Sequence, residues 1–402
     1  MSITGILRRC GASVVLRAIG VLLAIAMPTL LGTAHCSAAT KHTDSLSHRL
    51  SFELRPAYNI ISHYTFRNNG DPVNCALSAH ARYAFSFSES SHFGKLYPSA
   101  YQGVGIAAYT FLHPDITGRP MLVYILQGGR IANLSERLSL NYEWNLGFSW
   151  GWQPNDAMNS RCNVMINLAL PIAWRVTPHW ELSLTPDFTH FSNGDTHFPN
   201  AGTNLFGLRL GVAYIFDGRY DKAAARRYIA PSEELKARSF VDHITYDIIL
   251  YSGWRGDRFT EGGRLFVIDK PLPIVGIAFQ PTYRLNNYFG IGASLDIQAD
   301  RSLNLYNGVS DESGTTIAYT QPPLWQQVEA GVSLRGEIYA PIFTLGAGFG
   351  INLHKCGYDS TRFYTTFSLK AFVTRTLFLH FGYRFDTTQY THNLMYGLGV
   401  RF

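Results

Sequence analysis

The chain has 402 residues and a formal net charge of +6, with 15% charged and 14% aromatic residues. A soluble domain commonly carries about 25% charged residues, so this chain is lean in charge. After residue 40, no stretch reaches the roughly 20 consecutive apolar residues of a membrane helix. Many aromatic residues without such a helix favour a transmembrane β-barrel. The alternative is a soluble all-β protein.

Residues 1–39 have the layout of an export signal. Three arginines precede an apolar run over 21–31, and the small residues Ser37 and Ala39 are spaced for cleavage after Ala39. A single membrane anchor is the alternative, which the shortness of the run disfavours. Removing these three arginines lowers the charge from +6 to +3. Neither value argues for nucleic acid as a partner.

The clearest strand spans Arg137 to Trp152, where eight apolar residues alternate with eight polar or small ones. Side chains alternate between the two faces of a strand, so one face is apolar throughout, as in a lipid-facing barrel strand. Similar segments lie near 50–57, 78–88, 101–111, 119–126, 163–176, 181–189 and 206–216. These make about eight strands, and eight is a number that closes a barrel.

Residues 217–243 break the alternation with mixed charge, and we interpret them as a charged periplasmic linker. A second series of strands follows near 244–254, 273–284, 288–299, 325–338, 342–354, 361–373, 376–386 and 392–402. The last strand ends on Phe402, like the aromatic C-terminal signature of bacterial outer-membrane proteins. We therefore expect an all-β, antiparallel transmembrane protein with two tandem eight-stranded barrels, over 40–216 and 244–402. One barrel of about sixteen strands is the alternative.

The turns predict the direction of the strands. Outer-membrane barrels keep short turns on the periplasmic side and long loops outside. The tight turn Thr177 to His179 is therefore periplasmic, and the strand from Trp180 runs outward. Its far end, at His190 and Ser192, reaches the outer leaflet, where lipopolysaccharide resides.

His190 and Ser192 share the parity of the apolar residues of their strand and so face lipid. The alternative is that the strand has already left the membrane and that they belong to a solvated loop. Polar residues on a lipid face are candidate functional residues. Side chains at i and i+2 stand side by side, so His190 is placed to act as a general base for the Ser192 hydroxyl.

The surrounding motif is similar to that of a known family. The pattern H-x-S-N, then P-N-x-G and a polar residue twelve positions after the serine, resembles the lipid A 3-O-deacylases of the PagL type, a family of acyloxyacyl hydrolases. The residues that carry it are His190, Ser192, Asn193, Pro199, Asn200, Gly202 and Asn204. The resemblance covers about residues 48–216. It implies an eight-stranded barrel in the Gram-negative outer membrane, with its site facing lipid.

The same resemblance implies roles for single residues. Ser192 resembles the nucleophile, His190 the base and Asn193 an oxyanion donor, while Asn200 and Gly202 shape the site. The implied enzyme is a carboxylic ester hydrolase, a serine esterase. It removes an ester-linked acyl chain from lipid A in the membrane, with no metal or other cofactor.

One position departs from the family, which has a glutamate where this chain has Asn204. An amide oxygen still accepts the imidazole N–H, as asparagine does in papain-like proteases, but it does not stabilise the imidazolium by charge. The loop residue Asp195 is an alternative third member. The competing function is a porin-like or structural barrel with a vestigial site.

The remaining polar and aromatic residues have simpler interpretations. We expect Glu143, Arg175, Asp187 and Arg209 to form a buried polar network in the first barrel. We expect four tryptophans to face lipid: Trp144, Trp150, Trp152 and Trp174. Signal cleavage leaves Cys75, Cys162 and Cys356, so at most one disulfide forms among them, with Cys75 and Cys162 as the candidate pair.

Overall fold

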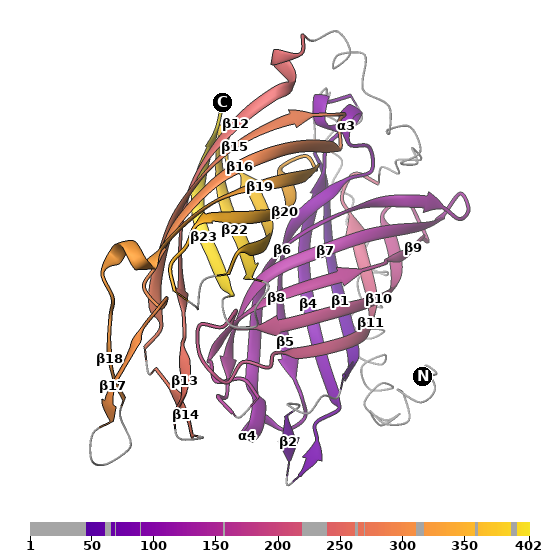
Figure 1. Cartoon of the computed structure of the whole chain (residues 1–402). Coiled ribbons are helices and arrows are strands. Elements are labelled where there is room, and N and C mark those ends of the chain that lie inside the picture. The colour runs from indigo at the N-terminus through magenta and orange to yellow at the C-terminus, as the bar shows by residue number, and fades with distance from the viewer. Residues whose placement is uncertain are drawn as a thin grey trace. The chain divides into compact units, whose positions relative to one another are not determined.

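The computed structural model describes residues 46–60, 66–68, 70–88, 90–155, 157–218, 239–261, 264–268, 270–310, 317–357, 361–386 and 392–402. They form two compact units, each built on one closed barrel (Figure 1). In these ranges, no helix has the length and hydropathy to cross a membrane. The predicted signal, 1–39, and residues 219–238 of the predicted linker lie outside the described residues.

The first barrel closes in the order β11, β1, β4, β5, β6, β7, β8 with β9, and β10, which pairs again with β11. All neighbouring strands in this ring are antiparallel. The strands span Ser47–Asn59 (β1), Cys75–Ser86 (β4), Tyr101–Thr110 (β5), Gly118–Asn133 (β6), Leu138–Trp152 (β7), Cys162–Ala169 (β8), Ile172–Arg175 (β9), Trp180–Ser192 (β10) and Thr203–Ile215 (β11). Its connections contain β2 (Arg67–Asn68), β3 (Asp71–Pro72), α3 (His92–Leu96) and α4 (Pro114–Thr117).

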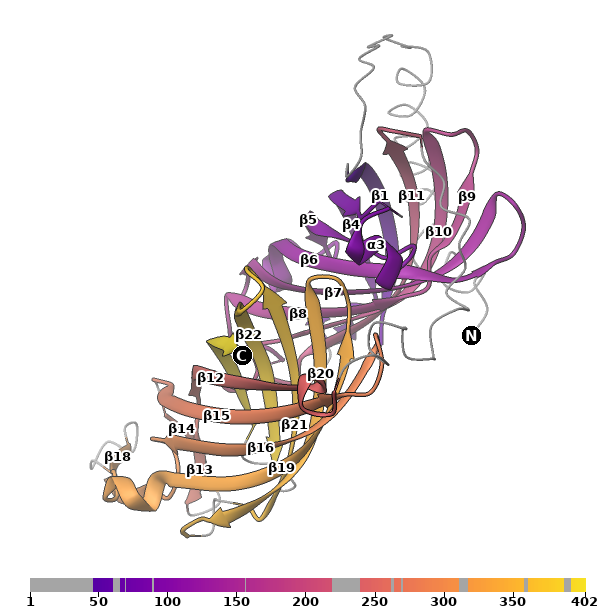
Figure 2. The same ribbon diagram turned by 90° about the horizontal axis from the view of Figure 1, so that it is seen from above.

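The second barrel closes with eight strands in the order β12, β15, β16, β19, β20, β21, β22 and β23 (Figure 2). The strands span Ile244–Arg255 (β12), Leu272–Arg284 (β15), Phe289–Asp300 (β16), Val328–Tyr339 (β19), Phe343–His354 (β20), Phe363–Phe372 (β21), Leu377–Asp386 (β22) and Asn393–Arg401 (β23). Its connections contain η2 (Val241–His243), η3 (Leu324–Gln327), and the hairpins β13 (Arg258–Glu261) with β14 (Arg264–Val267) and β17 (Tyr306–Ser310) with β18 (Ile317–Thr320). Because each unit closes separately, the prediction of two eight-stranded barrels is confirmed. The alternative of a single sixteen-stranded barrel is wrong.

One predicted strand, 163–176, is divided into β8 and β9 at Pro171. Proline has no backbone N–H to donate to a neighbouring strand, so it interrupts the hydrogen-bond ladder. Its carbonyl still accepts a bond of 2.8 Å from the Asn141 N–H, and Leu170 N donates to Pro186 O over 3.1 Å. β8 and β9 therefore occupy one strand position in the ring, between β7 and β10.

The alternation of β7 agrees with the sequence pattern until Gly151. Phe148 and Trp150 are 46% and 45% exposed on the outer face, whereas the intervening Ser149 is buried. Gly151 has a φ of +85°, and it alone stands opposite two residues of β6, which makes a β-bulge. The bulge turns Trp152 inward, so the prediction that Trp152 faces lipid is wrong.

The other predicted lipid-facing tryptophans differ from one another. Trp150 and Trp174 are about half exposed, at 45% and 50%, as expected for the outer face. Trp144 shares their face but is only 9% exposed, and its Nε1 donates to Gln127 Oε1 over 2.6 Å.

The two ends of the first barrel differ in their connections. One end, called the loop end below, carries the connections 60–74, 111–117, 153–161 and 193–202. The other, called the turn end, carries the short turns 134–137 and 176–179 and one longer connection, 87–100. In β10, the site residues His190 and Ser192 lie at the loop end.

A network of ion pairs fills the middle of the first barrel, as the sequence predicts. Arg209 contacts Glu53, Glu143 and Asp187 at 3.0–3.1 Å, and Arg82 also bonds Glu53 and Glu143. Arg55 adds a 2.5 Å pair with Asp187. The prediction is wrong for Arg175, which pairs instead with Glu181, nearer the turn end.

The second barrel is filled in the same manner. Lys370 and Arg401 pair with Asp247 over 2.6 and 2.7 Å, and both also contact Glu337. Further along, Arg335 pairs with Asp296, Arg384 with Glu329 and Arg255 with Asp300.

The disulfide considered between Cys75 and Cys162 is not formed, and none of the three described cysteines is disulfide-bonded. Cys75 begins β4 and Cys162 begins β8, with β5, β6 and β7 between them in the ring. Four strand steps are half the circumference of an eight-stranded barrel. At about 4.8 Å per step along the wall, the pair is too far apart for a disulfide.

The ion-pair network predicts that Glu143→Gln destabilises the first barrel. This change leaves Arg82 and Arg209 without one of their buried carboxylates, and breaking a buried pair costs about 3–5 kcal/mol. Guanidinium unfolding of the refolded protein in detergent measures the effect. The exposed residue Glu136, in the turn 134–137, supplies the control variant Glu136→Gln. Equal unfolding midpoints for the two variants would contradict this account.

Candidate active site

The site begins with the alternation of β10. Phe191 is completely buried inside the first barrel, where its ring lies 5.3 Å from Tyr109 and 5.1 Å from Trp152, measured between centroids. Neighbouring residues on a strand face opposite ways, so the packing of Phe191 sends His190 and Ser192 outward. Both are half-buried and lie on the face of the exposed Phe188. The predicted outward orientation is therefore confirmed.

Asn204 stands directly across from His190. The two residues are register partners of β10 and β11, and His190 Nδ1 lies 2.8 Å from Asn204 Oδ1. An amide oxygen only accepts hydrogen bonds, so Nδ1 donates and carries the proton of the neutral ring. The lone pair is then on Nε2, which is the form that a general base requires. Asn204, rather than Asp195, occupies the position that orients the imidazole.

Asn204 is itself held by the neighbouring strand. Its backbone carbonyl accepts a bond of 2.8 Å from Ile60 N, at the end of β1. Next to it, the Thr203 hydroxyl donates to Asn59 Oδ1 over 2.9 Å. The start of β11 is thus fixed on both sides, by β10 and by the end of β1, and the Asn204 side chain is presented to His190 from a regular strand.

Asn200 joins the loop 193–202 to the serine. Its Nδ2 donates to Ser192 Oγ over 3.1 Å, and its Oδ1 accepts from the Asn193 backbone N–H over 3.1 Å. Asn193 is only 3% exposed, and this N–H is directed at Asn200. The amide donor at the Ser192 hydroxyl is therefore the side chain of Asn200.

A second loop supports Asn200. Asn200 forms an isolated β-bridge with Met158, Asn159 N donates to Pro199 O, and Ala201 N donates to Ala157 O. Met158 is buried in the apolar cluster that includes Phe191 and Trp152. Sequence patterns do not reveal this support, because loop-to-loop pairing leaves no periodic signal.

Gly202 permits the His190 ring to occupy its place. Its φ is +67°, and a Cβ there would lie 2.9 Å from His190 Cε1 and 2.8 Å from the Phe191 carbonyl oxygen. Both distances are shorter than ordinary carbon contacts, and L side chains rarely adopt this backbone conformation. The structure thus places Asn200 at Ser192, with Asn193 bonded to Asn200. Gly202 and Asn204 lie at His190, two residues before Ser192 on the same face of β10.

The described residues contain no group of three or more His, Cys, Asp or Glu side chains placed to hold a metal ion. The Asn200 amide contacts Ser192, and the His190 imidazole lies two residues away on the same face of β10. These are the groups of acid–base and hydrogen-bond chemistry at a serine nucleophile.

The fold defines a membrane-type antiparallel barrel with a serine and a histidine on its outer face. Residues 63–213 match the family model of lipid A 3-O-deacylase (PagL), and residues 244–402 match the C-terminal domain of acyloxyacyl hydrolase, named after PagL. Together these matches cover more than three quarters of the chain, which therefore belongs to the PagL lipid A deacylase family. The second match was not predicted, because 244–402 contains no H-x-S motif.

A comparison with curated proteins found no match. Among solved structures, Neisserial surface protein A is 11% identical, and the match covers 43% of this chain and 99% of that one, with a TM-score of 0.31. An outer membrane channel from Pseudomonas putida F1 is 12% identical over 91% and 98% of the two chains, with a TM-score of 0.20. The Acinetobacter baumannii outer membrane protein Omp33 is 7% identical over 89% and 98%, with a TM-score of 0.15.

The contacts of Gly202 predict that Gly202→Ala displaces the His190 ring and lowers the reactivity of Ser192. A fluorophosphonate probe labels an activated serine covalently, so its rate of reaction with Ser192 measures this reactivity. We expect a fall of about tenfold or more, since one misplaced hydrogen bond to an ionising group is worth about 1.5–3 kcal/mol. The exposed neighbour gives the control Ala201→Ser. Equal labelling of both variants would contradict the role of Gly202.

Proposed function

We propose that the protein is an outer-membrane serine esterase that hydrolyses an ester-linked acyl chain of lipid A, at the 3 position. The observation that carries this proposal is the outward-facing set of Ser192, His190 and Asn204 on two paired strands of a lipid-exposed wall. Membership of the PagL family supports the hydrolase class and the lipid A substrate. The N-terminal signal, removed after Ala39, would direct the chain to this membrane.

Orientation in the membrane follows from the two ends of the first barrel. Short turns face the periplasm in outer-membrane barrels, so the loop end faces outward. Ser192 and His190 then lie at the level of the outer leaflet, where the glucosamine and its ester-linked acyl chains are located. A substrate in this leaflet approaches the wall of the barrel from the side and need not enter the lumen.

The reaction we propose has two halves. In the first, His190 Nε2 takes the proton of Ser192 Oγ as this oxygen attacks the ester carbonyl. The tetrahedral intermediate collapses with transfer of that proton to the sugar oxygen, which leaves an acyl-Ser192 ester and a free sugar hydroxyl. In the second half, His190 activates a water molecule that cleaves the acyl-Ser192 ester, releasing a fatty acid and restoring the serine.

Amide groups supply the electrostatic stabilisation in this mechanism. The Asn200 side chain donates to Ser192 Oγ at rest, and we infer that the same Nδ2 group donates to the oxyanion that develops beside Oγ as the carbonyl is attacked. Asn193, whose backbone N–H donates to Asn200 Oδ1, fixes the amide in that orientation. Asn204 orients the imidazole but, being neutral, does not stabilise the imidazolium by charge.

The nucleophile and the base are tested by substitution. Ser192→Ala and His190→Ala should each lower fatty acid release from purified lipid A by about 10⁶-fold, as loss of either residue does in a serine protease. Gas chromatography of the released acids, with refolded protein in detergent, is the measurement. His197→Ala, in the same connection, is the matched control and should keep its activity. Full activity in Ser192→Ala would overturn the serine mechanism.

The role of Asn204 predicts a graded series of activities among its variants. Asn204→Ala should lose about tenfold in kcat, because it removes one neutral hydrogen bond to the ring. Asn204→Glu should equal or exceed the wild type, since a carboxylate stabilises the imidazolium that forms during attack. Initial rates of the same assay give the order of the three proteins. A loss in Asn204→Ala as large as that in His190→Ala would show that the amide does more than orient the ring.

The competing function, a porin-like barrel, makes a different prediction. Both lumens contain buried ion-pair networks, and most of these charged side chains are less than 10% exposed. We therefore expect no steady conductance when the purified protein is inserted into planar lipid bilayers. A general porin prepared in the same way is the control. Stable open steps of the size that the porin gives would favour the channel function.

A further inference from the structure

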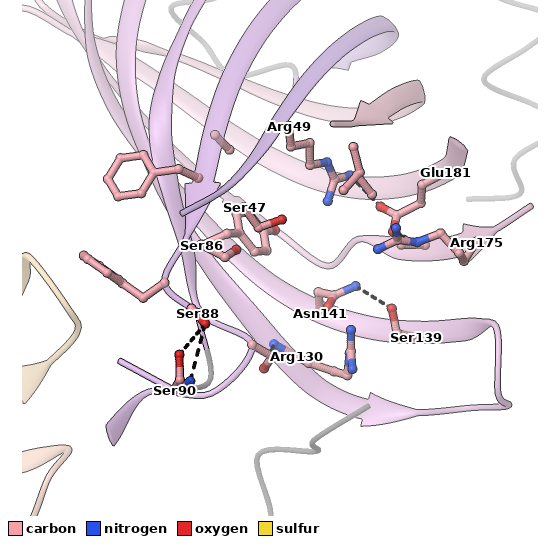
Figure 3. A pocket seen from close by; sticks show the side chains of 17 residues that line it. Ser47, Arg49, Ser86, Ser88, Ser90, Arg130, Ser139, Asn141, Arg175 and Glu181 are labelled. Carbon is pink, nitrogen blue, oxygen red and sulfur yellow. Dashed lines mark hydrogen bonds and ion pairs between the residues drawn. The ribbon is translucent and has the colours of Figure 1, made fainter. Parts of the chain in front are cut away.

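The lumen of the first barrel contains a cavity of about 570 Å³ at its turn end, far along β10 from the proposed active site. Strands β1, β4, β5, β6, β7, β9, β10 and β11 all contribute to its wall near the turn end. Figure 3 shows the side chains that surround this space. Its volume is within the usual range for sites that bind small molecules, about 300–1,000 Å³.

The charges of this cavity are unequal. Arg49, Arg130 and Arg175 line it, and Glu181 is the one carboxylate among the described residues of its wall, which gives a net charge of +2. Glu181 lies 2.6 Å from Arg49 and 3.5 Å from Arg175, so its charge is shared by two cations. Arg130 is 8% exposed. Positive charge held in a polar recess of low exposure raises the local concentration of anions.

Neutral hydrogen-bonding groups complete the wall. Six serines line the cavity together with Asn141, which donates to Ser139 Oγ over 3.2 Å. Hydroxyl groups rotate to donate or accept, so they adapt to the oxygen atoms of a bound ligand. Three guanidinium groups with several hydroxyls form a donor set suited to phosphate oxygens.

The connection 87–100 forms part of the wall through Phe87, Ser88, Ser90 and Ser99. It is much longer than the turns 134–137 and 176–179 at the same end, and it contains α3. Within it, Ser91 caps α3 by accepting from Gly94 N over 3.0 Å. Long connections kept at the end of a barrel that favours tight turns are commonly functional.

The second barrel provides an internal comparison. Near its own turn end, Lys370 and Arg401 pair with the carboxylates Asp247 and Glu337, while Arg284 donates to the carbonyls of Asn286 and Asn287 in the adjoining turn. Its connections there, 285–288, 340–342 and 373–376, are all short. Barrel closure therefore does not require a long connection at this end, and the first barrel has one.

We propose that this turn-end cavity is a binding site for a small molecule that carries a phosphate monoester. Such a group bears a charge of about −1.5 to −2 at neutral pH, opposite in sign to the net charge of the described wall residues. Its source is either a free phosphorylated compound or the headgroup of a lipid such as phosphatidic acid. Arg130 and Arg175 bind the phosphate oxygens, and the serines bind the remainder of the ligand.

Titration calorimetry of the full-length protein in lipid nanodiscs tests this proposal, with inorganic phosphate and then glycerol 3-phosphate as probes. We expect saturable binding of both, weakened about tenfold to a hundredfold in Arg130→Gln and in Arg175→Gln, the value of a charge-assisted hydrogen bond. Arg137→Gln, an exposed arginine in the turn 134–137, is the matched control and should bind as the wild type does. The use of two separate arginine variants guards against one of them failing to fold.

Two nanodisc compositions distinguish the sources. If the natural ligand is a lipid headgroup, phosphate should bind at least tenfold more weakly in discs containing phosphatidic acid than in discs of phosphatidylcholine alone. Equal binding in both discs points to a free phosphorylated compound. No saturable binding by the wild type, or equal affinity in Arg130→Gln, Arg175→Gln and Arg137→Gln, would overturn the proposal. None of these measurements depends on esterase activity, so their failure is separate from failure of the proposed function.

Discussion

The packing of Phe191 inside the first barrel is the constraint on which the proposed site depends. Its ring contacts Tyr109 and Trp152 in a buried aromatic cluster, and it lies between the two residues of interest on β10. A shift of one residue in register would move Phe191 to the lipid face and His190 and Ser192 into the cluster. Burying an imidazole and a hydroxyl there without partners is unfavourable, whereas a buried phenyl ring is stabilising. The core of the barrel therefore fixes the outward direction of the site.

The two barrels share their topology but differ in the motifs and cavities that they contain. Both close with eight antiparallel strands, and both are filled by buried ion pairs. Of the two barrels, only the first contains the H-x-S motif, and the basic cavity lies at the turn end of the same barrel. Buried ion pairs inside each barrel hold its strands in place. A site on the outer face needs such a rigid support, because the strands position the residues of the site.

The sequence predicted the strands well because a membrane barrel strand has a strict period of two. The strand over 137–152 and the final strand at Phe402 agree with β7 and β23 to within a few residues. The exceptions have local causes. Pro171 divides one strand because it lacks an N–H, and the bulge at Gly151 turns Trp152 inward. A single glycine in an alternating pattern does not reveal a bulge, because glycine also occurs in regular strands.

For the site, the spacing of the motif predicted that His190 and Ser192 face outward and that His190 pairs with Asn204. Parity and hairpin register determine both, so they can be derived from sequence. The contact of Asn200 with Ser192 depends on how two connections pair, through Met158 and Asn159, and no periodicity encodes it. The basic cavity was also beyond prediction, because its arginines come from strands far apart in the sequence.

The central claim is that Ser192 cleaves an ester of lipid A within the membrane. Mass spectrometry of lipid A from Gram-negative cells that produce either the wild-type protein or Ser192→Ala tests it most directly, with equal amounts of each protein in the outer membrane. We predict that the wild type yields lipid A lighter by one hydroxyacyl chain and that Ser192→Ala yields unmodified lipid A. An unchanged acyl pattern in both strains, with the folded barrel present, would contradict the account.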